Sequence, residues 1–303
     1  MIDLKRIPSP IIRRGNATVA YRDPAVVFHE GVFRLFYSHV VREGDGRRFW
    51  YLGVMRSRDL VTWSEPELLT PRDQNLNYSS PGNVIRFNGK WVICLQTYLT
   101  PNNEEFGTED ARVWTMESDD LERWGPARLL AVKGPDVAVK DMGRMIDPYL
   151  LEDKDEPGKW WCFYKQNGMS YSSSRDLKTW TYEGRTKCGE NVCVLVDREA
   201  DEYVVIHSPK NGVGVLRSRD LKEWRDEGVT TLGQAQWPWA RGRLTAGFVL
   251  DMRSHPEIGK YLLFFHGSAP NTMEVHGHAS LGLAWGEDLR RWEWAEGGQA
   301  GRV

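Results

Sequence analysis

The stretch SRDLKTW (Ser174–Trp180) decides the fold, because its Asp-Leu-x-x-Trp pattern occurs at five places in the chain. The other four copies are SRDLVTW (Ser57–Trp63), SDDLERW (Ser118–Trp124), SRDLKEW (Ser218–Trp224) and GEDLRRW (Gly286–Trp292). A single match would carry no weight. Five matches, with successive tryptophans 44 to 68 residues apart, indicate a repeat architecture with one unit per blade.

Each copy ends a unit that opens with three strand-like segments. In the third unit these are DPYLLE (residues 147–152), KWWCFYKQ (159–166) and GMSYSSS (168–174), and a short fourth strand follows the tryptophan. Short apolar strands separated by turn residues are typical of all-β folds. Four strands repeated five times predict a five-bladed β-propeller with four antiparallel strands in each blade.

The repeated aspartate and tryptophan have a structural interpretation. An aspartate in a tight turn accepts hydrogen bonds from backbone amides, and a tryptophan packs between blades. We therefore expect the five repeat aspartates to stabilise turns rather than to take part in catalysis; they are Asp59, Asp120, Asp176, Asp220 and Asp288.

The repeats also set the domain boundaries. Residues 1–19 are expected to form an N-terminal extension lying on the barrel, residues 20–296 a single propeller, and residues 297–303 a C-terminal tail. Two longer loops interrupt the pattern, at residues 100–110 in the second blade and 268–279 in the fifth.

Composition excludes several classes of partner. The 40 Lys and Arg nearly balance the 42 Asp and Glu, which argues against a nucleic-acid ligand. No stretch approaches the ~18 apolar residues of a membrane span, and the N-terminus lacks the apolar core of a signal peptide. We expect a cytoplasmic protein, although a mature chain that had lost a leader would read the same. Nothing in the sequence indicates its oligomeric state.

The four cysteines predict buried free thiols. Three of them, Cys94, Cys162 and Cys193, lie in apolar runs, and no C-x-x-C pair occurs anywhere. A zinc site is therefore not expected.

Propeller topology predicts which residues line one rim of the central channel. The inner strand of each blade begins at that rim, and the second strand returns to it. The predicted inner-strand starts are Asp23, Asn83, Asp147, Glu190 and Thr245, and the predicted second-strand ends are His39, Gln96, Lys165, His207 and His266. The set is unusually polar, since three carboxylates converge among three histidines and a lysine.

Three neighbouring carboxylates suit the cleavage of glycosidic bonds. One must be protonated to give its proton to the leaving oxygen, one must be ionised, and a third can raise the pKa of the acid. Trp237 and Trp239 are candidate platforms for sugar stacking. The alternative is a purely structural salt network in which the acids pair with Arg22, Arg144 or Lys165.

With these residues in place, the chain resembles the five-bladed propeller glycosidases of glycoside hydrolase families 43 and 32 over roughly residues 18–295. The resemblance implies that Asp23, in YRDPAVV, is the base or nucleophile. It implies that Asp147, in MIDPYLL, tunes the pKa of the acid and binds substrate, and that Glu190, in CGENVCVL, is the general acid.

The chain departs from both families. It lacks the longer Asn-Asp-Pro-Asn-Gly opening, the Arg-Asp-Pro second motif and the C-terminal sandwich common in family 32. It also lacks the Glu-Gly-Pro that family 43 often has at the acid. A family-43-like enzyme is favoured. No cofactor is required, although some relatives hold calcium in the channel near a blade-five histidine, which makes His278 a candidate metal contact.

The expected activity is hydrolysis of terminal bonds in short oligosaccharides of arabinofuranoside, xyloside or fructofuranoside type. The expected substrate contacts are Arg22, His39, Asn83, Gln96, Lys165, His207, Trp237, Trp239 and His266. Two alternatives stay open. One is a propeller glycoside phosphorylase with a phosphate site at His207, Lys210, Arg241 and Arg243, and the other is a carbohydrate-binding propeller without catalysis.

Overall fold

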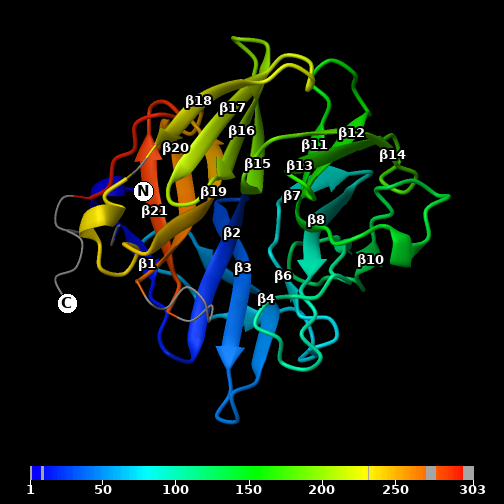
Figure 1. The fold of residues 1–303 in the computed structure, drawn as a ribbon. Helices are drawn as coiled ribbons and strands as arrows, with labels where there is room; N and C mark the ends of the chain where they lie inside the picture. The colour runs from blue at the N-terminus through cyan, green and yellow to red at the C-terminus, as the bar shows by residue number, and fades with distance from the viewer. Residues whose placement is uncertain (1, 8–9, 231, 271–277, 296–303) are drawn as a thin grey trace.

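Five antiparallel sheets surround a central channel in the computed structural model, which describes residues 2–7, 10–230, 232–270 and 278–295 (Figure 1). The predicted five-bladed propeller with four strands in each blade is confirmed. Helix in the described residues is limited to three short 3-10 turns, at Leu4–Arg6, Val139–Asp141 and Gln234–Gln236. None of the described helices has the length and apolar character needed to cross a membrane.

The blades follow one another along the chain. Blade one contains β2 (Val19–His29), β3 (Val32–Arg42), β4 (Arg48–Ser57) and β5 (Glu67–Leu68). Blade two contains β6 (Tyr78–Ser79) and β7 (Val84–Phe87), which both pair with β8 (Lys90–Thr97), followed by β9 (Val113–Ser118) and β10 (Arg128–Leu129). Blade three contains β11 (Ile146–Glu152), β12 (Trp160–Lys165), β13 (Met169–Ser174) and β14 (Thr181–Thr186). Blade four contains β15 (Glu190–Asp197), β16 (Glu202–Ser208), β17 (Val213–Ser218) and β18 (Arg225–Thr230), and blade five contains β19 (Arg243–Met252), β20 (Lys260–Ser268), β21 (Ser280–Gly286) and β1 (Ile11–Arg13).

The fourth strand of blade five comes from the beginning of the chain. Strand β1 pairs antiparallel with β21, with Ile11 opposite Gly282, and the Leu283 amide donates to the Pro10 carbonyl at 3.0 Å. The segment expected to lie on the barrel as an extension therefore contributes a strand to it. After Trp292 the described residues form a single bridge, Trp285 to Glu293, in place of a further strand. The ring is closed by pairing between the two ends of the chain.

The repeat turns have the predicted structural role. In the first turn, Asp59 Oδ1 accepts the amides of Val61 and Thr62 at 2.9 and 2.8 Å, and Ser57 Oγ accepts the amide of Leu60 at 2.8 Å. Leu60 is held at φ 63°. The other four repeat aspartates accept the amides two and three residues ahead in the same way. These bonds satisfy backbone groups in a conformation that an isolated chain would avoid.

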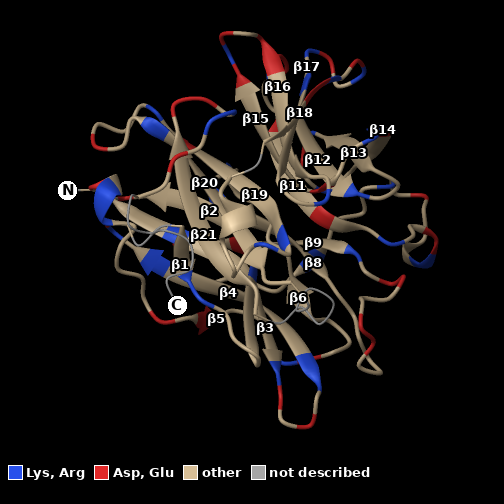
Figure 2. Cartoon of the chain, turned by 60° about the vertical axis from the view of Figure 1, so that its left-hand side comes forward, with Lys and Arg blue, Asp and Glu red and all other residues tan. Residues whose placement is uncertain are grey.

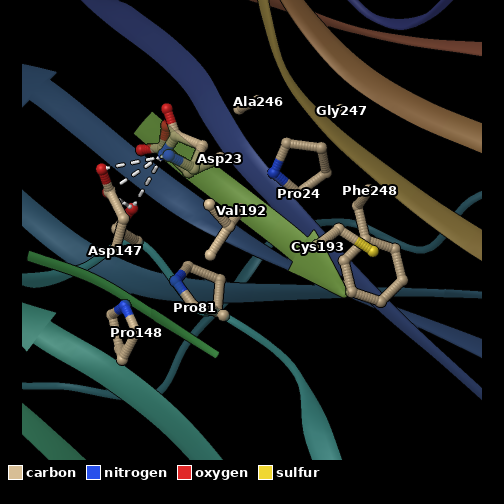
Figure 3. Close-up of a pocket in the computed structure, with 13 residues that line it drawn as sticks. Asp23, Pro24, Pro81, Asp147, Pro148, Val192, Cys193, Ala246, Gly247 and Phe248 are labelled. Atoms are coloured by element: carbon tan, nitrogen blue, oxygen red, sulfur yellow. Dashed lines mark hydrogen bonds between the residues drawn. The ribbon is translucent and has the colours of Figure 1, made fainter. Parts of the chain in front are cut away.

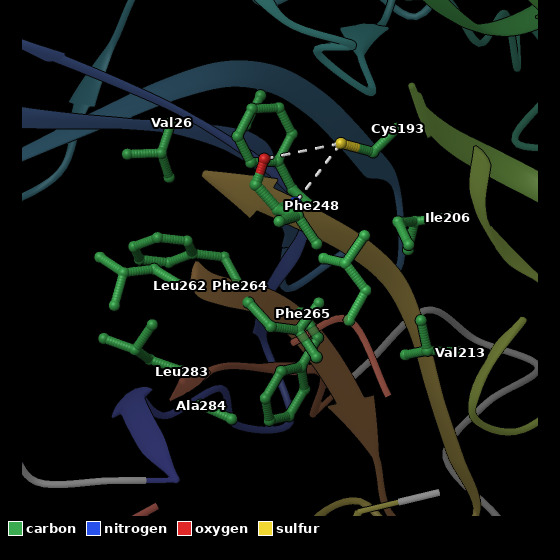
Figure 4. Packing of buried hydrophobic residues seen from close by; sticks show 14 of the residues in the cluster. Val26, Cys193, Ile206, Val213, Phe248, Leu262, Phe264, Phe265, Leu283 and Ala284 are labelled. Atoms are coloured by element: carbon green, nitrogen blue, oxygen red, sulfur yellow. Dashed lines mark hydrogen bonds between the residues drawn. The ribbon is translucent and has the colours of Figure 1, made fainter. Parts of the chain in front are cut away.

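Apolar side chains fill the space between blades. Phe264, Phe265 and Leu283 are fully buried where blade five packs on its neighbours (Figure 4). The four cysteines are free thiols, as predicted, and Cys188 alone is partly exposed. Charged side chains of both signs are scattered over the outer turns (Figure 2), which matches the near-zero net charge of the chain.

Candidate active site

Each inner strand is interrupted near the rim by one residue with a positive φ. The five residues, here called the ring residues, are Asp23, Ser80, Asp147, Asn191 and Ala246, with φ of 48°, 45°, 52°, 50° and 53°. At four of them the strand register shifts by a bulge, and in blade two the strand breaks between β6 and β7. Such backbone costs on the order of 1–3 kcal/mol per residue and is concentrated at functional sites.

The ring residues are tied to neighbouring blades through their amides. The acceptor lies on the second strand of the preceding blade for four of them: Asp23 donates to His266 Nδ1 at 3.0 Å, and Ser80, Asp147 and Ala246 donate to Ser38 Oγ, Gln96 Oε1 and Ser208 Oγ, each at 2.7 Å. In blade three the equivalent second-strand position is Lys165, whose ammonium cannot accept a hydrogen bond from the Asn191 amide. The Asn191 amide donates instead to Asp147 Oδ2 at 3.3 Å.

A continuous hydrogen-bond chain joins the two ring aspartates. Ser38 Oγ donates to Asp23 Oδ2 at 2.7 Å and also accepts the Ser80 amide. Ser80 Oγ in turn donates to Asp147 Oδ1 at 2.8 Å, and Asn191 Nδ2 reaches the same oxygen at 3.0 Å. Figure 3 shows Asp23 and Asp147 at the same end of the channel. The two carboxylates are thus fixed in place by groups that are themselves held by the backbone ring.

Burial raises the pKa of both ring aspartates. For Asp147 the desolvation is reinforced by the nearby charges of Glu190 and Asp23, and the pKa rises to about 6. The pKa of Asp23 is also raised by burial, against the opposing effect of the Arg22 charge. A carboxyl with a pKa of about 6 is partly protonated near neutral pH, which suits acid–base chemistry.

Glu190 has the opposite electrostatic environment. Its two carboxylate oxygens contact Lys165 Nζ and an Arg243 guanidinium nitrogen. Burial alone would raise the pKa of Glu190, but the two cations outweigh it and lower the pKa to about 2. In the free site Glu190 is therefore an ionised carboxylate between two positive charges.

These groups line a pocket of about 210 Å³. Its walls include the three carboxylates and the cations Arg22, Arg144, Lys165 and Arg243, together with the aromatic side chains of Trp50, Tyr98 and Phe106. Beneath Asp23 and Asp147 the channel narrows to a space of about 20 Å³, enough for about one water molecule, between Pro24, Pro81 and Pro148 (Figure 3). The pocket is therefore deep and narrow at its base.

The comparisons with known proteins agree with this site. A family model described as the glycosyl hydrolases family 32 N-terminal domain matches residues 21–195. The chain belongs to this family. It is a glycoside hydrolase, as the three-carboxylate pattern predicted. No curated protein matches this glycoside hydrolase in sequence.

Solved structures share its fold along nearly the whole chain. An exo-1,5-α-L-arabinanase from a bovine ruminal metagenomic library is 16% identical, with 92% of this chain and 98% of that chain covered and a TM-score of 0.61. A glycosyl hydrolase from Bacteroides ovatus is 14% identical over 97% and 94%, with a TM-score of 0.66. The family 43 (GH43_1) enzyme from Xanthomonas citri complexed with xylose is 13% identical over 96% and 95%, with a TM-score of 0.59. The predicted resemblance to families 43 and 32 is confirmed.

The structure places six of the predicted site residues of this glycosidase in the pocket wall: Arg22, Asp23, Gln96, Asp147, Lys165 and Glu190. His266 lies behind Asp23 with only 1% of its surface exposed, and positions that residue through its amide. Glu190 directly precedes the ring residue Asn191. In blade four it therefore occupies the strand position that Arg22, and not Asp23, occupies in blade one.

His39, His207 and Asn83, predicted as substrate contacts, do not line the pocket in the structure. The second-strand positions that face the ring are Ser38 and Ser208, and a shift of one residue along a strand moves a side chain to the other face. His39 consequently packs among tyrosine rings, and His207 is buried and accepts the Gly189 amide at 3.1 Å. Asn83 bridges blades two and three through two hydrogen bonds to the Leu150 backbone.

Trp237 and Trp239 are not sugar platforms in this structure. They stack on each other at 5.7 Å between ring centroids, pack against Phe265, and are only 2% and 5% exposed. The aromatic wall of the pocket is provided instead by Trp50, Tyr98 and Phe106. A hydrophobic core contact and a sugar platform leave the same signal in a sequence, namely closely spaced tryptophans.

His278 does not lie in a metal site. It is exposed, and its amide donates to the Asn16 carbonyl at 3.1 Å. Among the residues that the structure describes, no group of three or more His, Cys, Asp or Glu side chains could hold a metal ion. No step proposed below involves a metal.

Several pocket residues were missed in the sequence. Ser80 was recognisable, because Ser80-Pro81 repeats the Asp23-Pro24 and Asp147-Pro148 pattern at a strand start. Ser38 could be identified only from the register of the strand pair β2 and β3, and the bulge at Asp23 changes that register. Arg144 and Phe106 lie in loops that follow no repeat, so no periodic signal marks them.

Proposed function

We propose that this chain hydrolyses terminal glycosidic bonds of short oligosaccharides, with an arabinofuranosyl, xylosyl or fructofuranosyl unit in the pocket. The observation that carries the proposal is the meeting of Asp23, Asp147 and Glu190, from three different blades, in the wall of one pocket. The narrow base beneath the ring aspartates supports a terminal unit over an internal one, since a polymer could not pass between the three prolines.

We assign the roles by charge and position. Asp23, fixed by Ser38, is the base that activates water or the nucleophile that attacks the sugar. Glu190 protonates the leaving oxygen, and Asp147 influences the pKa of Glu190 through its charge and binds the sugar.

The proton has to be moved before Glu190 can act. In the free site below about pH 6 the proton lies on Asp147 rather than Glu190, because Glu190 is held ionised by Lys165 and Arg243. A leaving group that enters between Glu190 and either cation would separate the ion pair and raise the pKa of Glu190. Substrate binding would thereby create the acid that the reaction needs.

The phosphorylase alternative has less support. Of its four predicted phosphate ligands only Arg243 lines the pocket, and that guanidinium contacts Glu190. His207 is buried, while Lys210 and Arg241 are exposed. The alternative of a non-catalytic sugar-binding propeller is opposed by the family and by the presence of all three carboxyls.

Leaving-group dependence tests the proposal. Aryl arabinofuranosides, xylosides and fructofuranosides, with the matching disaccharides, would identify the sugar. Glu190→Gln should lose turnover of the disaccharide severely and of the activated aryl glycoside much less, because a good leaving group needs little protonation. Asp23→Asn should lose both. Equal losses on both substrates in Glu190→Gln, or normal rates in Asp23→Asn, would contradict the proposed roles, and a sugar phosphate product would indicate phosphorolysis.

A further inference from the structure

The outer wall of the pocket carries a guanidinium that no carboxylate neutralises among the described residues. Lys165 and Arg243 both contact Glu190, and Arg22 acts on the charge of Asp23. Arg144 differs from these three, since in the described parts of the chain no carboxylate lies within salt-bridge distance of it. Its guanidinium carbon lies 5.8 Å from the centroid of the Tyr98 ring.

Arg144 is presented on a fixed segment of backbone. Gln166 Nε2 donates to the Met142 and Arg144 carbonyls at 2.9 and 3.1 Å, and Met145 donates its amide to the Ala111 carbonyl at 3.0 Å. Gly143, at φ 73°, makes the turn that precedes Arg144. Because this segment is bonded on both sides, the backbone of Arg144 is fixed, and the guanidinium lies beside the Tyr98 ring, which lowers the entropic cost of binding a ligand there.

Arg144 lies outside the narrow part of the pocket, on what we take to be the leaving-group side. The base of the pocket is formed by the ring aspartates and the three prolines, and Arg144 is not part of that base. Arg144 lines the wider part together with Tyr98 and Phe106, of which Phe106 is 56% exposed. When a terminal sugar lies in the 210 Å³ pocket against Asp23 and Asp147, the group on the other side of the scissile bond meets Arg144 and this aromatic wall.

We propose that the enzyme cleaves a terminal sugar from an acidic partner, in which the unit next to the scissile bond carries a carboxylate or a sulfate or phosphate ester that binds Arg144. The inference rests on the proposed function and adds the chemical class of the leaving group. A planar guanidinium can hold such an anion with two parallel hydrogen bonds. Tyr98 and Phe106 contact the face of the same sugar unit.

Binding measurements test this without requiring turnover. The ligands are uronic-acid oligosaccharides, the same oligosaccharides after reduction of their carboxyl groups to alcohols, sulfated disaccharides, and inorganic phosphate alone. Titration calorimetry in low and high salt gives the affinity of each for the unaltered enzyme and for Arg144→Met, with Arg144→Lys as the variant that keeps the charge. Arg128→Met, at the exposed outer edge of blade two, is the matched control.

We expect an acidic oligosaccharide to bind about tenfold more tightly than its neutral form, an advantage that salt weakens. Arg144→Met should abolish the preference, Arg144→Lys should keep part of it, and Arg128→Met should change nothing. Tighter binding of the uronic or the sulfated series identifies the anion. Equal binding of acidic and neutral forms, or a preference that survives Arg144→Met, would overturn the inference, and so would binding of inorganic phosphate when no acidic oligosaccharide binds. Turnover separates the two proposals, since hydrolysis without an acidic preference contradicts only the inference, whereas acidic binding without hydrolysis contradicts only the proposed function.

Discussion

Replacing Asp147 by Asn should stabilise the fold at neutral pH while it impairs catalysis. Asp147 is 7% exposed, and its pKa is about 6 in the folded protein against 3.8 in the unfolded chain. A carboxyl whose pKa is raised by folding destabilises the native state when it is ionised, so the penalty grows from pH 4 upward and is complete above pH 6. The shift corresponds to about 3 kcal/mol at pH 8 and to less than about 1 kcal/mol at pH 4.

The hydrogen bonds of Asp147 reduce this gain. An Asn side chain keeps the oxygen that accepts from Ser80 Oγ and Asn191 Nδ2, but its amide nitrogen would face the Asn191 amide, which donates to Asp147 Oδ2 at 3.3 Å. Losing that long bond costs about 1 kcal/mol. The net expectation is stabilisation of about 2 kcal/mol at pH 8 and a slight destabilisation at pH 4.

The assay is thermal and urea unfolding of both proteins at pH 8 and pH 4. A gain of 2 kcal/mol should raise the Tm at pH 8 by about 3 °C. Asp136→Asn, at an exposed aspartate of blade two, is the control and should leave the Tm unchanged. A Tm that falls at pH 8, or that changes equally at both pH values, would show that Asp147 carries no ionisation penalty, and the proposed location of the proton on Asp147 would then be wrong.

Three further outcomes follow from the contacts. Lys165→Met should raise the pKa of both Asp147 and Glu190, because the Lys165 charge lowers both, and should move the basic limb of the kcat/KM profile between pH 4 and 9 to higher pH; an unmoved limb would argue against these carboxyls as the source of the catalytic proton. Trp237→Ala should destabilise the protein by about 3–5 kcal/mol in urea, since the ring is fully buried against Trp239, and unchanged stability would contradict its place in the core. Deleting residues 2–13 should lower the Tm sharply because blade five loses β1, whereas a Tm within a few degrees would mean that this strand does not close the ring.

The blades could be predicted because the information for each one is local. Asp-Leu-x-x-Trp specifies a turn by the bonds that its own aspartate makes to the next few amides, as at Asp59. The pairing of β1 with β21 could not be predicted in this way, since its partners lie at opposite ends of the chain and the three residues of β1 follow no repeat. The repeats therefore predicted all the strands of four blades, but in the fifth blade they did not identify β1 as the outer strand.

The acids were predicted better than their surroundings, for a reason of geometry. Asp-Pro and a strand-opening Glu are visible in the sequence, whereas the positive φ of the ring residues is not. Each bulge adds a residue to one strand and changes which residues of the partner face the channel. This is why Ser38 rather than His39, and Ser208 rather than His207, face the ring residues.

The same positions join the blades and prepare the chemistry. Ser38 accepts a hydrogen bond from the amide of Ser80 in the next blade and donates one to Asp23, so one side chain fixes both a blade junction and the carboxylate proposed as base or nucleophile. At the junction of blades three and four Lys165 takes the equivalent place and cannot accept an amide. At the rim that junction has instead the Lys165 contact with Glu190 and the long bond from Asn191 to Asp147. If substrate must separate Lys165 from Glu190 before catalysis, the junction whose ring amide has no neutral acceptor is also the one where the reaction has to break a contact.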